Sequence, residues 1–268
     1  MTIQALYSAA TGMMAMETKL DVVANNLANM ETTAFKRDRA NFEDLIYRHE
    51  QYPGAQDSAG QYTPTGTQIG LGVRTQSTQT EFTQGSIKQT GQELDVAIEG
   101  MGFFQVTNPD GQIVYTRAGN FSKNANGNLV TGSASDGRLL EPPIVIPTDA
   151  TSITISPEGI VSVTQQGSNQ MSQVGQIQLA SFINPQGLLK LGENLYRETD
   201  ASSAPTISNP GQNGLGTLQQ NMLESSNVEP VQELIDLITT QRAFDLNSQA
   251  IKTGDQLLQT VANLPRAQ

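Results

Sequence analysis

Residues 6–30, LYSAATGMMAMETKLDVVANNLANM, contain the apolar repeat that decides the fold of this end of the chain. Two rows of apolar residues recur every seven positions: Leu6, Met13, Leu20 and Leu27, and Ala9, Met16, Val23 and Met30. This spacing predicts one helix with an apolar stripe. We expect the helix to run from near Thr2 to about Asn29.

A matching repeat lies near the other end, in the row Leu237, Phe244, Ile251 and Leu258. Pro230 precedes it and suits the first turn of a helix, where the missing N–H of proline does least harm. Because a helix gains most of its stability from burying such a stripe, each stripe needs a partner. We therefore expect the terminal helices to pack as a coiled-coil-like module, with Leu20, Val23 and Leu27 against the C-terminal row.

The first helix carries very little charge. Between residues 2 and 30 the only charged side chains are Glu17, Lys19 and Asp21, whereas a soluble coiled coil usually flanks its seam with Glu and Lys. Such a helix fits best where several helices crowd around it, as in the core of a polymer. An ordinary helix pair within one chain is the alternative.

From Ile69 to about Asn221 the apolar pattern changes to a period of two, which is typical of strands. Residues 103–107 and 112–116 flank a turn at 108–111, and residues 153–156 and 160–164 flank a turn at 157–159, so both pairs predict hairpins.

Further turn and edge signals lie in the same region. Asn126-Gly127 predicts another turn, and prolines around Ile144–Ile146 predict a strand at a sheet edge. Before this region, residues 51–68, QYPGAQDSAGQYTPTGTQ, predict an extended loop or hairpin.

The predicted fold class is α+β, with an inserted, mostly antiparallel all-β domain between two helices. The predicted segments are a helical polymerisation segment (1–45), an extended Gly/Pro-rich connection (46–75), the β domain (76–221) and the closing helix (222–268).

Composition argues against several classes of function. The net charge of −11 and pI near 4.5 argue against a nucleic-acid partner, since phosphate binding needs a basic face. The one basic cluster, Lys36, Arg37 and Arg39, is interrupted by Asp38, and we interpret it as a solvated surface.

Catalytic and ligand-binding patterns are scarce as well. The chain has a single histidine, His49, and no cysteine, which leaves few ways to build a nucleophile, a general base or a zinc site. Gly100-Met101-Gly102 lacks the spacing of a phosphate-binding loop and predicts a tight strand entry. Asn124, Asn126 and Asn128 alternate like calcium ligands, but the acidic residues of an EF-hand are missing. We expect no enzyme activity, cofactor, metal or small-molecule substrate.

Three segments together resemble the flagellar rod and hook axial proteins. They are LDVVANNLANMETTAFKR (20–37), DVAIEGMGFFQV (95–106) and SNVEPVQELIDLITTQRAFDLNSQAIKTGDQLLQ (226–259). Ala34 stands where family members often have glycine. YPGAQ (52–56) and PTGTQIGLGVR (64–74) are similar to the extra segment of distal rod subunits.

The resemblance implies a subunit that polymerises helically into a straight, hollow tube, with the terminal helices inside and the β domain outside. From the apolar rows and the matching segments together, we expect the residues of helix packing and assembly to be Leu6, Met13, Leu20, Val23, Asn25, Asn26, Leu27, Asn29, Leu237, Gln241, Arg242, Phe244, Ile251 and Leu258. The residues that the resemblance assigns to the rod-specific segment are Tyr52, Pro53, Gly54, Pro64 and Gly66.

The implied partners are further copies of the chain, proximal rod proteins, the hook protein, the P and L ring proteins and the flagellar type III export apparatus. The implied location is the basal body, from periplasm to outer membrane, with export that uses no cleaved signal peptide; the first residues lack the pattern of such a peptide. Two alternatives stay open: a hook or proximal rod paralogue, and a secreted β-domain binding module.

A charge in the N-terminal stripe should abolish the polymer and leave the β fold intact. We expect purified Leu27→Asp protein to show the same strand content by circular dichroism and no tubes by electron microscopy, because the stripe could no longer be buried. Tubes formed by this variant would contradict the stripe interpretation.

Overall fold

The computed structural model describes residues 3–54, 56, 61–62, 64–132, 137–167 and 170–263. The chain divides into two compact units. Unit 1 is Met1–Ala28, Asp38–Gln79 and Glu229–Gln268, and unit 2 is Asn29–Arg37 and Thr80–Val228. Residues 29–37 are thus grouped with residues 80–228, and residues 38–79 are grouped with the two helices; the four predicted segments stay a prediction.

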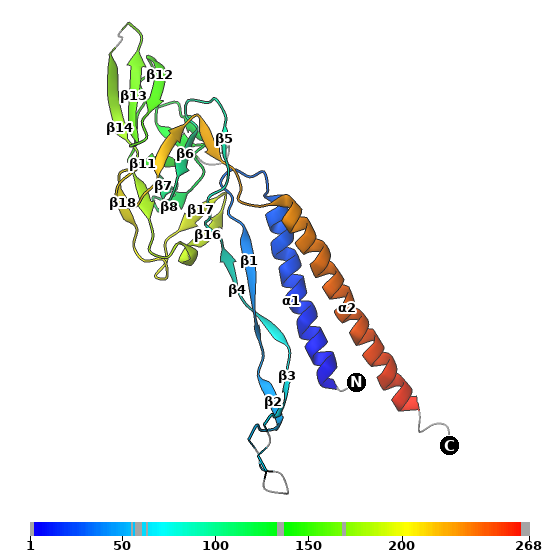
Figure 1. Cartoon of the computed structure of the whole chain (residues 1–268). Coiled ribbons are helices and arrows are strands. Elements are labelled where there is room, and N and C mark those ends of the chain that lie inside the picture. Colours follow the sequence, from blue (N-terminus) through cyan, green and yellow to red (C-terminus); the bar gives the residue numbers. More distant parts are fainter. Residues whose placement is uncertain are drawn as a thin grey trace. The chain divides into compact units, whose positions relative to one another are not determined.

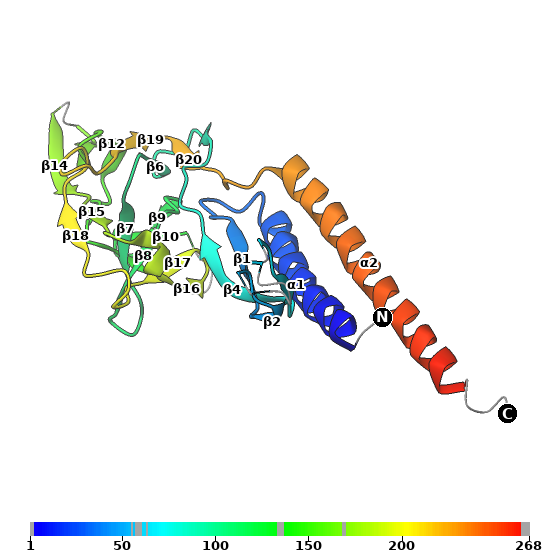
Figure 2. The ribbon, with the colours of Figure 1, turned by 60° about the horizontal axis from the view of Figure 1, so that its bottom comes forward.

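Unit 1 contains both long helices, which run side by side in Figures 1 and 2. α1 spans Ile3–Ala28 and α2 spans Pro230–Asn263. α1 is rich in Ala, Met and Leu, which are strong helix formers, and it ends within a residue of the predicted Asn29. Thr2, the expected start, lies outside the described residues. Pro230 occupies the first position of α2, as predicted.

Unit 1 also contains two pairs of strands, β1 (Asp38–Asp44) with β4 (Val73–Thr80) and β2 (Tyr47–Gln51) with β3 (Thr67–Gly70). β2 and β3 pair from Tyr47↔Gly70 to Gln51↔Thr67, so they hold the ends of the predicted extended segment together. Within that segment Gln56 bridges Tyr62. Residues 55, 57–60 and 63 of it lie outside the described part of the chain.

Unit 2 is built from short strands and one 3-10 turn. They are β5 (Ile87–Gln89), β6 (Val96–Glu99), β7 (Phe103–Thr107), β8 (Ile113–Thr116), β9 (Phe121–Lys123), β10 (Leu129–Thr131), β11 (Leu139–Glu141), β12 (Ala150–Ile155), β13 (Ile160–Gln165), β14 (Met171–Gln176), β15 (Leu179–Ser181), η1 (Pro185–Gly187), β16 (Leu189–Gly192), β17 (Leu195–Arg197), β18 (Thr206–Ser208), β19 (Thr217–Gln220) and β20 (Met222–Glu224).

The largest sheet of unit 2 has the strand order β16-β17-β8-β7-β11-β10-β9, with β15 between β7 and β18. The strands β12-β13-β14 form a second sheet, and β19-β6 and β20-β5 form two-stranded pairs. The strands of these sheets pair in antiparallel fashion. Both predicted hairpins are present, β7 with β8 and β12 with β13, so the α+β class with an antiparallel β body is confirmed.

The predicted edge strand Ile144–Ile146 is wrong. Prolines on both sides limit its backbone pairing, and the segment forms only a single bridge, Asn128↔Val145. Its two isoleucines nevertheless enter the core, each with 1% of its surface exposed.

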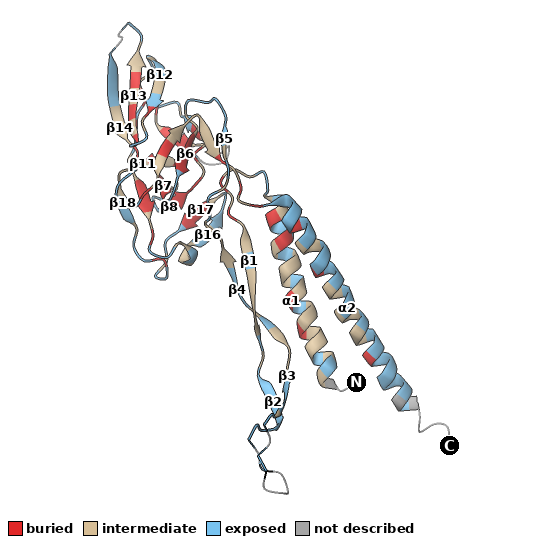
Figure 3. Cartoon of the chain, in the orientation of Figure 1, coloured by how far each residue is buried: buried red, intermediate tan, exposed pale blue. Residues whose placement is uncertain are grey.

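The core of unit 2 lies where β6, β7, β8, β11 and β13 meet, which Figure 3 shows as the concentration of buried residues. Phe104 is fully buried there and packs edge-to-face on Phe121, with ring centroids 5.0 Å apart. A second, smaller cluster is aromatic and surrounds Phe103 and Tyr196. The adjacent pair in Gly-Phe-Phe therefore serves two different clusters, because successive side chains of a strand point to opposite faces.

Removing the Phe104 ring should destabilise unit 2 strongly. We expect Phe104→Ala to lower the free energy of unfolding by about 3–5 kcal/mol, the usual range for a buried phenylalanine replaced by alanine. Urea unfolding followed by tyrosine fluorescence measures it, since the chain has 6 tyrosines and no tryptophan. Ile207→Ala, at an exposed strand position, is the control and should change little.

Candidate assembly site

The helices of unit 1 meet along a seam that is small and polar on the α2 side. Its members recur every seven residues: Glu233, Thr240, Asn247 and Gly254. A β-carbon at Gly12 of α1 would lie 3.1 Å from the Asn247 amide, and Gly254 packs directly on the Leu6 side chain. Small residues let the two backbones approach closely, so the seam fixes the spacing and register of the pair with little apolar burial.

Asn26 joins three segments at one end of this seam. Its side-chain amide donates to the Asp38 carbonyl at 2.9 Å and to Glu233 Oε2 at 3.3 Å, and its oxygen accepts the Asp38 N–H at 2.9 Å. Asn26 and Glu233 are each 1% exposed. The second asparagine of the ANNLAN string therefore ties α1 to the start of β1 and the first turn of α2.

The structure places the residues of the predicted stripes at different depths. Val23 and Asn26 are buried; Leu6, Met13, Leu20, Leu27, Asn29, Leu237, Phe244 and Ile251 are half-buried; Asn25, Gln241, Arg242 and Leu258 are exposed. The C-terminal apolar row thus flanks the seam, and the polar row of α2 occupies its centre. The assembly role of these residues stays a prediction.

A further apolar face lies on the first turns of α2. Val231, Leu234, Ile235 and Ile238 follow the i, i+3, i+4, i+7 pattern, so they share one side of the helix. Val231 is 73% exposed, and the other three are between 46% and 49% exposed. In Figure 3 most of α2 is drawn as exposed, in contrast to α1. These four large aliphatic residues form an apolar surface that stays exposed to solvent within unit 1.

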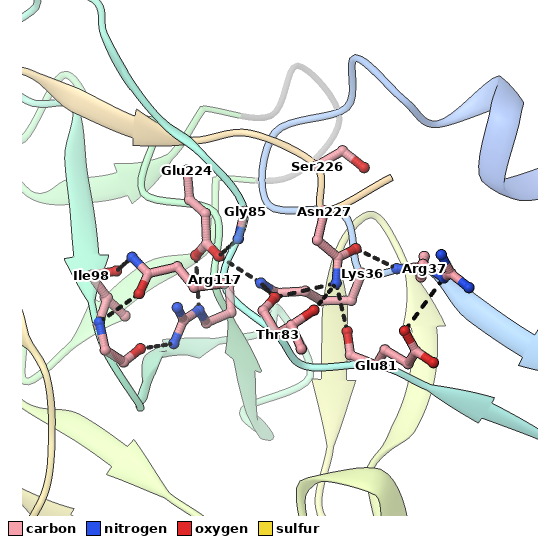
Figure 4. A network of polar contacts seen from close by, with 12 residues as sticks. Lys36, Arg37, Glu81, Thr83, Gly85, Ile98, Arg117, Glu224, Ser226 and Asn227 are labelled. Carbon is pink, nitrogen blue, oxygen red and sulfur yellow. Dashed lines mark hydrogen bonds and ion pairs between the residues drawn. The ribbon is translucent and has the colours of Figure 1, made fainter. Parts of the chain in front are cut away.

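Within unit 2, three charged residues form a fully buried cluster, shown in Figure 4. The ammonium of Lys36 lies 2.5 Å from Glu224 Oε1, and the Nε of Arg117 lies 3.0 Å from Glu224 Oε2. The side chains of Lys36 and Glu224 are 0% exposed. The interpretation of Lys36 as a solvated residue is therefore wrong: its position in a charged run hid a buried ion pair that only a distant acid could satisfy.

Every charge in the cluster has further partners. Lys36 also donates to the Thr83 carbonyl at 2.7 Å, and Glu224 Oε1 also accepts the Gly85 N–H at 3.0 Å. Arg117 Nη1 donates to the carbonyls of Gly100 and Gly102, both at 2.8 Å. These bonds satisfy the polar atoms that burial removed from water, which is the condition for a buried ion cluster to be stable.

Backbone hydrogen bonds around the cluster link the segment that follows α1 to the segment that precedes α2. The Ala34 N–H donates to the Glu224 carbonyl at 2.8 Å, and the Arg37 N–H donates to Asn227 Oδ1 at 2.8 Å. Asn227 in turn donates to the Glu81 carbonyl and to Thr83. Ala34 has a φ of +57° and is fully buried, so this turn holds an alanine in the left-handed conformation that residues with a side chain rarely adopt.

Burial and charge act in opposite directions on this cluster. Burial by itself raises the pKa of Glu224, but the guanidinium of Arg117 and the ammonium of Lys36 more than offset this and hold the pKa of the carboxyl below its usual range. Burial lowers the pKa of Lys36, and Glu224 only partly opposes that shift.

Two of these three residues could not be recognised from their local sequence. Arg117 and Glu224 each stand alone among uncharged neighbours in the sequence. They bind each other across 107 positions, which a local pattern does not reveal. Among the seam residues, Glu233, Thr240, Asn247 and Gly254 were missed because a search for apolar periodicity passes over a polar row. A search for any seven-residue period in small or polar residues would have found it.

The residues predicted for a rod-specific segment lie at the end of the β2–β3 pair. The ring of Tyr52 stacks on His49 with centroids 5.2 Å apart, and both are exposed. A β-carbon at Gly66 would lie 2.7 Å from the backbone nitrogen of Pro53, so only glycine fits there. Gly54 and Pro64 are exposed.

Other candidate chemistry finds no support in the part of the chain that is described. Within it, no group of three or more acidic or histidine side chains could hold a metal ion, and no helix is long and apolar enough to cross a membrane. Asn124 Oδ1 accepts the N–H groups of Asn126 and Asn128, so these asparagines close a turn. A cavity of about 300 Å³ beside Phe103 is lined mainly by apolar residues, and its guanidinium, Arg117, is already bound to Glu224 and two carbonyls.

Three family models match the chain. Residues 6–36 match the "Flagella basal body rod protein" model, residues 97–163 match the "Flagellar hook protein FlgE/F/G D1 domain" and residues 219–264 match the "Flagellar basal body rod FlgEFG protein C-terminal" model. Flagellar basal-body rod protein FlgG of Caulobacter vibrioides is 47% identical over 263 residues, which cover 98% of this chain and 99% of that one. The chain belongs to the FlgG family of flagellar basal-body rod proteins.

A second FlgG, from Buchnera aphidicola subsp. Baizongia pistaciae, is 46% identical over 262 residues, covering 98% of this chain and all of the relative. Flagellar basal-body rod protein FlgF of Caulobacter vibrioides is 36% identical over 250 residues, covering 90% of this chain and 89% of that one. Within one organism the FlgG sequence is thus the more similar of the two. The chain is a structural subunit of the flagellar rod, and it acts at the flagellar basal body.

Acid should weaken this FlgG-family protein through Glu224. A carboxyl whose pKa is lower in the folded than in the unfolded state contributes stability that is lost as the pH falls below its unfolded value, here from about pH 5 downward. We expect Glu224→Gln to lower the free energy of unfolding at pH 7 by about 3–5 kcal/mol, because two buried cations lose their partner. It should also flatten the dependence of stability on pH below about pH 5.

Urea unfolding at a series of pH values measures both effects. Glu99→Gln, which removes an exposed carboxyl from β6, is the matched control and should keep the wild-type slope. An unchanged slope in Glu224→Gln would show that Glu224 does not titrate in this window.

Proposed function

We propose that this chain polymerises helically into the hollow distal rod of the flagellar basal body, linking the proximal rod to the hook and transmitting torque. The observation that carries this proposal is the apolar face of α2, Val231, Leu234, Ile235 and Ile238, which stays exposed while α2 packs on α1. A helix pair that leaves such a face uncovered gains stability when a neighbouring subunit covers it. Contacts between different faces of identical subunits do not close and therefore build filaments.

The helix pair would form the inner layer of the tube, and the β unit the outer layer. α1 carries only three charges, so its surroundings in the polymer can be other helices. Tyr7 and Met14, seven residues apart on α1 and both exposed, add apolar surface for such contacts. Coiled-coil-like packing of α1 on α2 would then continue from one subunit to the next.

The β2–β3 segment would add contacts between neighbouring subunits and stiffen the tube. The close fit of Gly66 on Pro53 and the stacking of Tyr52 on His49 support a defined conformation at the end of this pair. A preformed segment loses less conformational entropy when it binds than a flexible one.

The partners follow from this assignment. They are further copies of the chain, proximal rod proteins, the hook protein and the P and L ring proteins, with delivery through the flagellar type III export apparatus. The assembled rod would extend from the periplasm to the outer membrane. The role is structural, and the described residues offer no arrangement that supports catalysis.

Assembly should fail when a charge is placed on the exposed face of α2. We expect Ile238→Asp to keep the monomer fold, because Ile238 is about half exposed and contributes little to the helix pair, and to raise the concentration needed for polymerisation at least tenfold, since a loss of about 1.4 kcal/mol per contact has that effect. Circular dichroism, sedimentation and electron microscopy of the purified chain measure these properties.

Thr239→Asp is the matched control, because it puts the same carboxylate on the neighbouring exposed position, away from the apolar row. It should polymerise like the wild type. Normal polymerisation of Ile238→Asp, or equal loss in both variants, would remove the support for this face as the assembly surface.

A further inference from the structure

The two segments that lead into the helices are held by one buried carboxylate. We define the N-terminal root as residues 29–37, which follow α1, and the C-terminal root as residues 224–228, which precede α2. Both belong to unit 2. The Lys36 ammonium of the N-terminal root reaches across 188 residues of sequence to Glu224 of the C-terminal root.

The two roots are also hydrogen-bonded to each other through their backbones. Both are bound as well to a third segment, residues 81–85. Ala34 donates to the Glu224 carbonyl, and Asn227 donates from its N–H to the Phe35 carbonyl at 3.4 Å. Asn227 accepts the Arg37 N–H and donates to Glu81 and Thr83, while Lys36 donates to Thr83 (Figure 4). Residues 81–85 therefore bind both roots at once.

The chemistry makes the two roots interdependent. If the N-terminal root detached, Glu224 would lose its ammonium partner, and the Thr83 carbonyl would lose the shorter of its two hydrogen bonds. If the C-terminal root detached, Lys36 and Arg117 would remain as two buried cations without a carboxylate. Removing one member of a buried, hydrogen-bonded ion pair is strongly unfavourable, because the other charge stays out of water. Neither root can therefore be released alone without that penalty.

The helix pair needs such a constraint because its seam is weak in apolar burial. On α2 the central positions are Glu233, Thr240, Asn247 and Gly254. Two helices with this seam would associate poorly if their ends were far apart, whereas short tethers raise the effective concentration of one helix for the other to about the millimolar range. Only residues 29–33 separate α1 from the Ala34 contact, and only residues 225–229 separate Glu224 from α2.

We propose that Lys36, Glu224 and Arg117 form a clasp that makes the two roots order as one cooperative unit and so holds α1 and α2 within reach of each other. The clasp acts in the single subunit before any assembly. It therefore goes beyond the polymer role, and it can fail while that role stands.

The test uses the full-length monomer and the variant Lys36→Met, which fills the volume of the lysine and leaves the Arg117–Glu224 pair in place. Hydrogen–deuterium exchange with mass spectrometry reports peptides of both roots and of strands β7 and β8. We expect exchange in residues 29–37 and in residues 225–228 to rise together, by about tenfold or more, with β7 and β8 unchanged. Lys123→Met, the same substitution at an exposed position of β9, is the matched control and should leave both roots protected.

A second readout follows the helices themselves. The chain has no cysteine, and Gly12 faces Asn247 across the seam, so Gly12→Cys with Asn247→Cys gives a single disulfide whose rate of formation reports how often the helices meet. We expect Lys36→Met to slow this rate by about tenfold through the lost effective concentration. Faster exchange in the N-terminal root alone, or an unchanged disulfide rate, would overturn the proposal.

A Lys36→Met protein that lost protection in β7 and β8 would have lost its fold, and a second variant then decides. Asn227→Ala removes the amide that joins Arg37 to residues 81–83 and leaves all three charges in place. It should loosen both roots together and slow the disulfide while β7 and β8 stay protected. Loosening of only one root in this variant would contradict a shared clasp.

Discussion

The buried carboxylate of Glu224 is the interaction on which the order of this subunit depends most. One oxygen binds Lys36 and the Gly85 N–H, and the other binds Arg117. The same three charged residues on the protein surface would contribute little to the free energy of folding, because water screens their attraction. Here the three side chains are removed from water, so any loss of one partner leaves a charge that cannot be solvated. The cluster therefore fixes which segments meet, even where its net contribution to stability is modest.

The helix pair of unit 1 follows a different principle. Its α2 seam is polar and small, with Glu233 bound to Asn26 and Gly254 packed on Leu6, so it specifies register and spacing. The larger aliphatic residues of α2 lie beside this seam or on its outer side. A subunit whose cohesion comes from polar specificity, and whose apolar surface faces outward, is suited to associate with copies of itself. The same arrangement in a permanent monomer would expose apolar surface without benefit.

The sequence predicted the elements well where a single local rule governs them. Period seven located α1, Pro230 located the start of α2, and turns at 108–111 and 157–159 located two hairpins, because each of these depends on neighbouring residues only. It failed at Ile144–Ile146, where apolar pattern indicated a strand but flanking prolines limited the ladder. It also failed at Lys36, since the decision between surface and core rests on Arg117 and Glu224, which lie far away in sequence. The polar seam was missed because apolar periodicity is blind to glycine, threonine and asparagine at buried positions.

Long-range charge explains one feature of the family match that local structure does not. The three matched regions are separate in sequence, yet each contains one member of the cluster: Lys36 closes the first, Arg117 lies in the second and Glu224 lies in the third. Lys36 also lies near the end of the ANNLAN-containing string, after a strained turn at Ala34, a conformation that persists only when the surroundings hold it. What holds it is the Glu224 carbonyl on Ala34 and the Glu224 carboxylate on Lys36. The conformation of the N-terminal signature thus depends on Glu224 near the C-terminus. A fragment that ended before Glu224 would lack the groups that bind Ala34 and Lys36.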